Sequence, residues 1–183
     1  MRTTPLAHLL VFACAALAAT ALGVAVFYRP PALPDDRSAS GPSPLQRTWK
    51  AYQRTFLVAG RVIRPTRDND TVSEGQAYAM LRAVWMDDQK TFDACYQWTE
   101  AHLSRQARFG DHLLAWHYGC PPGGTYQVLD WNAAADADLD YALALLLADR
   151  LWGRPSSPDL AAYRQKALAV AADILRLEVT ELA

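Results

Sequence analysis

Apolar residues recur at helical spacing over most of the chain between residues 45 and 179. A spacing of three to four residues between apolar positions is typical of helices that bury one face. It predicts five helices, over residues 45–57, 73–85, 88–103, 132–152 and 159–179. Residues 109–117 are expected to be a short helix or an extended piece, and 127–130 a short strand. Helices joined by short links predict an all-α fold of helical hairpins.

Local signals mark helix starts and the links between helices. Ser73 and Asp88 are typical N-cap residues, and each stands directly before an apolar row. Glycine, proline and a polar cluster predict a loop over residues 58–71, and Cys-Pro-Pro-Gly-Gly at 120–124 predicts a turn.

The N-terminal segment has a different pattern. Residues 9–28 carry no charge, and this run is long enough for a membrane span or a secretory signal. We therefore expect residues 1–28 to be a signal peptide or an N-terminal membrane anchor. Residues 29–44 hold five of the eleven prolines and predict an extended linker. The globular part is then 45–183, and the expected location is extracytoplasmic, either secreted or held at the membrane by this segment.

Composition narrows the function classes. The chain has 183 residues, about one domain, with 51% hydrophobic and 20% charged residues, which excludes an intrinsically disordered chain. A net charge of −1 gives no basic surface for nucleic acid. The histidines, including His117, share no metal-ligand spacing, so we expect no metal and no other cofactor. Asp68-Asn69-Asp70 resembles the start of a calcium loop without its remainder, and a polar surface loop is the better interpretation.

The first chemically suggestive segment is Ser73-Glu74-Gly75-Gln76-Ala77-Tyr78. Gly75 costs helix stability, which makes sense if some other group must approach the backbone there. Glu74 heads a row that continues through Tyr78 and Trp85, so its carboxylate is expected to point inward. The alternative is a carboxylate that only stabilises the helix N-terminus through the helix dipole.

The second segment places four aspartates within residues 130–140, at the start of an apolar helix. Asp136 begins a row of leucines at 139, 143 and 146, so Asp136 and these leucines are expected on the buried face. Asp138 points elsewhere and is expected to be a structural hydrogen-bond acceptor. Capping and dipole effects are the alternative, and they fit Asp130 or Asn132 better than an inward Asp136.

Two inward carboxylates at helix N-termini indicate paired-carboxylate chemistry of the glycosidase type. One of them must keep its proton near neutral pH, although the helix dipole favours the ionised form. Burial and a like-charged neighbour such as Asp136 are what would keep Glu74 protonated. Trp116 and Trp131, both near loops, are candidate platforms for sugar rings.

Six segments then occur in the order found in one enzyme family. They are Trp49-x-x-Tyr52-x-x-x-Phe56, Gly60-Arg61-Val62-Ile63, Ser73-Glu74-Gly75-Gln76-Ala77-Tyr78-Ala79-Met80-Leu81, Phe92-Asp93, Ala115-Trp116 and Asp136-Ala137-Asp138-Leu139-Asp140. With them the chain resembles glycoside hydrolase family 8, which contains bacterial endo-β-1,4-glucanases, chitosanases and some xylanases. The resemblance covers nearly all of 45–183, and the Ser-Glu-Gly-Gln and Asp-Ala-Asp segments are specific only in combination.

The resemblance implies an (α/α)6 barrel with a glycan cleft across one end and an inverting reaction. It implies that Glu74 is the proton donor and that Asp136 is the nucleophile or a carboxylate that positions substrate. The water-activating base would be an aspartate of the family's C-terminal half. The expected substrate contacts are Trp116, Trp131, Asp130, Asn132, Tyr78 and Gln76. Cellulose-type β-1,4-glucan is the favoured polysaccharide substrate.

Three features depart from the family pattern. Ala135 stands where the family has Ser or Thr, and Arg64 stands where relatives often have Asp. The third is length, because twelve helices with their loops need roughly 200 residues. About 139 residues follow the linker. We therefore expect the N-terminal part of an incomplete barrel, with a missing C-terminal half and little hydrolase activity by itself.

Two other interpretations stay open. The chain could be a non-catalytic glycan-binding or scaffold remnant, in which case binding survives Glu74→Gln and Asp136→Asn. It could also be an unrelated exported helical bundle whose segments match by chance.

Overall fold

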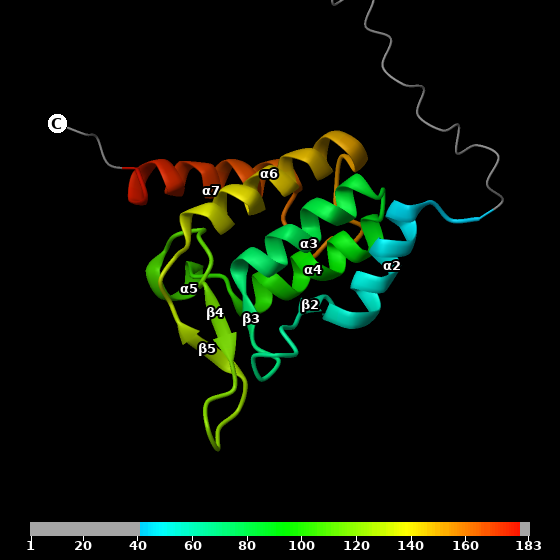
Figure 1. Cartoon of the computed structure of the whole chain (residues 1–183). Helices are drawn as coiled ribbons and strands as arrows, with labels where there is room; N and C mark the ends of the chain where they lie inside the picture. The colour runs from blue at the N-terminus through cyan, green and yellow to red at the C-terminus, as the bar shows by residue number, and fades with distance from the viewer. Residues whose placement is uncertain (1–40, 180–183) are drawn as a thin grey trace, which may run out of the picture. The chain divides into compact units, whose positions relative to one another are not determined.

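A computed structural model describes residues 41–179 (Figure 1). The expected signal or anchor at 1–28 and nearly all of the expected linker lie outside the described residues. Within residues 41–179, no helix is long and apolar enough to cross a bilayer.

The described part is mostly helical, as expected from the sequence. Its helices are α2 Pro44–Phe56, α3 Ser73–Trp85, α4 Gln89–His102, the one-turn α5 Gln106–Phe109, α6 Ala135–Trp152 and α7 Tyr163–Leu177. Its strands are β1 Leu57–Val58, β2 Arg61–Val62, β3 Thr71–Val72, β4 His117–Gly119 and β5 Gln127–Asp130.

The four long helices after α2 form two layers. Helix α3 packs against α6 and α4, and α6 also packs against α7 (Figure 1). Aromatic rings join α4 to α7 behind them, since the ring centroids of Phe92 and Tyr163 are 5.2 Å apart and those of Tyr96 and Tyr163 are 6.0 Å apart. All three side chains are fully buried. The core therefore lies between the α3–α6 layer and the α4–α7 layer.

A small antiparallel sheet, in the order β3-β4-β5, lies next to the starts of α3 and α6. Strand β3 continues directly into α3, and β5 leads through residues 131–134 into α6. Trp116, just before β4, accepts a hydrogen bond from Ser73 N at 3.0 Å and donates one to Asn132 O at 2.9 Å. The N-terminal ends of the two helices are thus tied to one backbone segment.

The loop before β3 is closely packed. Gly60 has a φ of +84°, and a Cβ there would lie 2.1 Å from the carbonyl oxygen of Ala94 on α4. Only glycine allows this approach, and glycine also favours a positive φ. The loop expected at 58–71 therefore contains the turn of the β1–β2 hairpin, pressed against α4.

Helix starts agree with the expectations only in part. Asp88 caps α4 as expected, because its side chain accepts a hydrogen bond from Thr91 N. Ser73 is not the N-cap of α3: Val72 holds that position, with no side-chain capping bond. Helix α6 begins at Ala135 rather than residue 132, and α7 at Tyr163 rather than residue 159.

The expected buried face of α6 was wrong. Asp136 is exposed, and so are Leu139 at 56%, Leu143 at 46% and Leu146 at 40%. The buried residues are instead Ala137, Asp138, Tyr141, Ala142, Ala144, Leu145 and Ala148. The helix is apolar on both sides, and α3 and α7 cover only one of them. Tyr78 and Trp85 of α3 are also exposed, at 54% and 65%.

Candidate active site

Glu74 lies in the first turn of α3, directly after the small sheet. Its side chain is half-buried, and the hydroxyl of Ser73 donates a hydrogen bond of 3.3 Å to its Oε2. Tyr78, one turn later, is exposed on the same side of the helix. Glu74 therefore faces the side of α3 that α4 and α6 leave open, rather than the core.

Asp136 occupies the corresponding place in α6, one residue after the helix begins. It heads the exposed leucine row, so it also lies on the open side. Because α3 and α6 pack together and both begin at the sheet, the two expected catalytic carboxylates lie at one end of one surface. Ala135, the departure from the family pattern, is the exposed residue before it.

Trp116 lies between these two helix starts. Its side chain is half-buried, and its indole lies beside Asp130 at the end of β5. The N–H of Asn132 and this indole lower the pKa of Asp130, which keeps that carboxylate ionised. Asp130, Asn132 and Trp116 are therefore adjacent and at the surface, as substrate contacts must be.

A charged row next to Trp116 was missed by the sequence analysis. Arg64 donates two hydrogen bonds to Asp70, of 2.7 and 2.5 Å, and His117 lies 2.9 Å from the same carboxylate. The hydrogen bond to Asp70 raises the pKa of Arg64, and the charges of Asp70 and Glu74 act in the same direction. Asp70 and His117 are 47 residues apart, so only the pairing of β3 with β4 shows that they belong together.

Gln76 is the clear correction among the expected substrate contacts. Its side chain is fully buried. Its Nε2 donates to Gly60 O and to Thr99 Oγ1, and its Oε1 accepts from Val62 N at 2.5 Å. A helix turns by about 100° per residue, so Gln76 points away from Glu74 into the core. Gln76 holds the β1–β2 hairpin against α4 and does not contact substrate.

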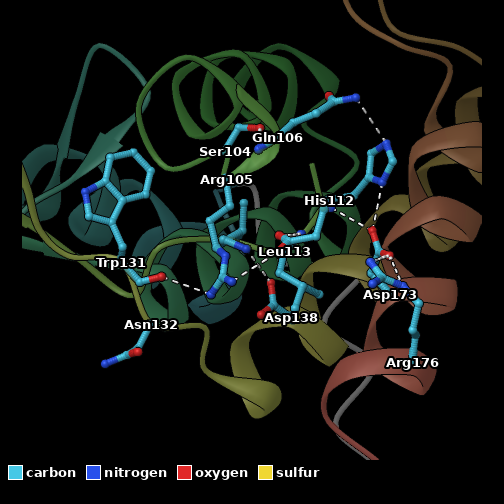
Figure 2. A network of polar contacts seen from close by, with 12 residues as sticks. Ser104, Arg105, Gln106, His112, Leu113, Trp131, Asn132, Asp138, Asp173 and Arg176 are labelled. Atoms are coloured by element: carbon cyan, nitrogen blue, oxygen red, sulfur yellow. Dashed lines mark hydrogen bonds and ion pairs between the residues drawn. The ribbon is translucent and has the colours of Figure 1, made fainter. Parts of the chain in front are cut away.

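Trp131 is half-buried and packs against α5. The ring centroids of Trp131 and Phe109 lie 6.1 Å apart in an edge-to-face arrangement, and the Arg108 guanidinium lies 5.3 Å from the centroid of the Trp131 ring. Its carbonyl accepts a hydrogen bond from Arg105 (Figure 2). Trp131 is thus at the rim of the same end of the helices, with part of its ring already in contact with protein.

Behind the open surface lies a buried polar network (Figure 2). Asp138 is fully buried and its Oδ1 accepts from Leu114 N at 2.9 Å, which confirms its expected structural role. Its Oδ2, the Nε of Arg105 and the Oε2 of Glu178 are buried without hydrogen-bond partners among the described residues. Burial raises the pKa of Asp138 to about 7, Glu178 and Asp111 add to the rise, and Leu114 N–H and Arg105 oppose it.

The raised pKa of Asp138 predicts a pH-dependent stability. Because the folded-state value exceeds the unfolded value of about 3.9, the stabilising contribution is complete below pH 4 and is lost as the pH rises through 7. Asp138→Asn keeps an oxygen for Leu114 N–H but cannot ionise. We expect it to raise the free energy of unfolding at pH 8 by about 4 kcal/mol relative to its effect at pH 4.

Urea unfolding from pH 4 to pH 8 measures this difference. Asp159→Asn, at an exposed aspartate, is the matched control and should leave the pH profile unchanged. A wild-type profile parallel to that of Asp138→Asn over the whole range contradicts the prediction.

The described residues include no group of three or more His, Cys, Asp or Glu side chains that could hold a metal ion. Asp70, in the segment expected to be a polar surface loop, is engaged by Arg64 and His117.

Comparison with known proteins places these features in context. The sequence pattern that defines the glycosyl hydrolases family 8 matches residues 31–178. An endoglucanase of Pseudomonas fluorescens is 37% identical over 130 residues, which are 70% of this chain and 31% of that protein. The chain thus spans about a third of the length of the curated relatives it matches.

Solved structures agree. The endo-1,4-D-glucanase of Vibrio fischeri aligns with a TM-score of 0.62 and 37% identity, covering 71% of this chain and 36% of that one. An endoglucanase of Komagataeibacter sucrofermentans aligns with a TM-score of 0.64 and 29% identity, covering 76% and 41%. The expected fold, helical hairpins of an incomplete (α/α)6 barrel, is confirmed.

Proposed function

Because the chain belongs to glycosyl hydrolase family 8, we propose that it is the N-terminal part of an enzyme that cleaves β-1,4-linked glucan. The observation that carries this proposal is that Glu74 and Asp136 begin two neighbouring helices on one open surface. A relative that matches 70% of the chain is named an endoglucanase, which supports a cellulose-type glucan as the substrate.

In the proposed reaction Glu74 protonates the leaving glycosidic oxygen, and Asp136 contacts and positions the sugar at the cleavage point. Trp116, Tyr78, Asp130 and Asn132 border the carboxylates and would hold neighbouring sugar rings. In an inverting reaction a further carboxylate activates water on the opposite side of the sugar. Since the chain spans about a third of its relatives' length, we assign that base to the part of the family domain that it does not span.

The exposed leucines of α6, together with Tyr78 and Trp85 of α3, support the same assignment. Large apolar surfaces of this kind on a soluble domain mark contact with another protein part. In the proposed enzyme this surface is the inner wall of the barrel, covered by further helices and, near the carboxylates, by substrate.

We expect the purified chain alone to release no measurable reducing ends from carboxymethylcellulose. The reason is that acid and water activation must act together on one bond. Cleavage by residues 45–183 that is lost in Glu74→Gln would contradict this expectation, because it would show that these residues form a complete site.

A non-catalytic glycan-binding role is the second candidate, favoured by the small share of the relatives that this chain spans. It predicts cellohexaose binding that survives Glu74→Gln and Asp136→Asn but is weakened in Trp116→Ala. Titration calorimetry with the full chain measures this, with Gln97→Ala at an exposed position of α4 as the control.

We also propose that the protein is extracytoplasmic, either secreted or anchored to the membrane by its N-terminal segment. The support is the uncharged run at 9–28 followed by the proline-rich segment. Fractionation of cells expressing the full chain, with and without residues 1–28, tests it.

A further inference from the structure

The row of side chains Arg64, Asp70 and His117 ends at the ring of Trp116. The imidazole of His117 stacks on the indole of Trp116, with ring centroids 4.8 Å apart and an angle of 28° between the planes. At its edge the indole lies beside the carboxylate of Asp130, whose pKa it lowers. Trp116 is therefore held on one ring face by His117, while its backbone is fixed by Ser73 and Asn132.

His117 is itself held by a charged partner. Burial alone would raise the pKa of Asp70, but hydrogen bonds from Arg64 and His117 keep it below its ordinary value. An ionised Asp70 can only accept, so the Nε2 of His117 carries the hydrogen that it donates. This bond fixes the plane of the imidazole, as a carboxylate does for a histidine that acts as a metal ligand. The charged groups that face His117 are Asp70 and Asp130.

We propose that Asp70 and His117 are positioning residues that set the ring plane of Trp116 for stacking on a sugar. The inference rests on the proposed function, which makes Trp116 a glycan contact. A ring fixed before binding loses less side-chain entropy when the sugar arrives. Asp70 and His117 act through Trp116 and do not themselves contact the substrate.

The first test observes Trp116 without any glycan. The chain has six tryptophans, and each gives one indole N–H signal in a ¹H–¹⁵N spectrum. Trp116→Phe identifies the signal of Trp116. We expect this signal to shift in His117→Gln and Asp70→Ala and to stay in place in Asp70→Asn, which keeps an acceptor for Nε2–H. The other five signals should not move.

A second histidine–aspartate pair provides the matched control. His112 Nδ1 lies 2.9 Å from Asp173, as His117 Nε2 does from Asp70, but no aromatic ring stacks on His112 in the described structure. His112→Gln should leave the Trp116 signal unchanged. A Trp116 signal that stays in place in His117→Gln overturns the inference.

The second test measures cellohexaose affinity of the full chain. Asp70→Ala and His117→Gln should weaken it about fivefold to tenfold, the cost of ordering one side chain on binding, and Asp70→Asn should restore it. In a Trp116→Ala background neither substitution should weaken binding further, because their effect passes through the indole. Additive losses, or a shifted indole signal with unchanged affinity, overturn the positioning role.

The two tests fail separately. If the wild-type chain binds no cellohexaose, glycan binding by this chain is refuted, and the indole signals still decide whether His117 and Asp70 fix the ring. If binding is present but the indole signal is insensitive to both substitutions, the proposed function stands and the inference falls.

Discussion

Glu74→Gln is expected to impair hydrolysis severely once this chain is completed by the rest of a family 8 domain. The suitable protein is a chimera in which residues 44–179 replace the matching part of the Pseudomonas fluorescens endoglucanase. Its turnover of carboxymethylcellulose should fall about 10³-fold, the usual contribution of a general acid. KM should change little, since glutamine retains the shape of the side chain and only the transferable proton is lost.

Asp159→Asn in the same chimera is the control, because Asp159 is exposed before α7 and away from both helix starts. Reducing-end release under saturating substrate gives kcat. A chimera that folds and hydrolyses substrate equally well with Glu74→Gln would refute Glu74 as the proton donor. On a substrate with a very good leaving group, Glu74→Gln should lower kcat much less, because that group departs without being protonated.

Gln76→Ala is expected to destabilise the chain by about 4–6 kcal/mol, a large part of the stability of a typical domain. The substitution leaves the buried Val62 N–H without the acceptor it now has at 2.5 Å, and removes the donor to Gly60 O and Thr99 Oγ1. It also opens a cavity between α3 and α4. The β1–β2 hairpin should separate from α4 as a result.

Urea unfolding followed by circular dichroism measures this loss. Gln97→Ala, an exposed glutamine on α4, should change stability by no more than about 0.5 kcal/mol. A Gln76→Ala chain that keeps its stability and loses only glycan affinity would restore the substrate contact that the sequence motif suggested. A loss of both stability and glycan affinity would follow from unfolding alone. Affinity is therefore compared only under conditions in which the variant is folded.

Part of the site could be predicted because local chemistry decides it. Glu74 and Asp136 stand at helix starts that hydrophobic spacing and family resemblance both indicate, and Asp138 is the structural acceptor that its place in the helix suggested. Residues 127–130 were predicted as a strand and form β5. The two-residue strands β1, β2 and β3 were missed, because so short a segment shows no period.

Other features could not be predicted because they depend on residues distant in sequence. Glu74 and Gln76 belong to one motif, yet one is half-buried at the open side and the other is fully buried. The pair of Asp70 and His117 exists only because β3 pairs with β4. The sequence places Asp70 in a polar surface loop and shows no metal-ligand spacing for His117, since neither residue has a partner nearby in sequence.

By itself, the sequence determined that this protein is a set of helical hairpins with two carboxylates at helix starts, because helix formation and capping depend on nearby residues. The tertiary structure decided which side of each helix is covered. Helix α6 is apolar on two sides, and the contacts with α3 and α7 bury Tyr141 and Leu145 and leave Leu139 and Leu143 exposed with Asp136. That choice places Asp136 on the open surface with Glu74, because burial is a property of neighbouring elements and not of one helix.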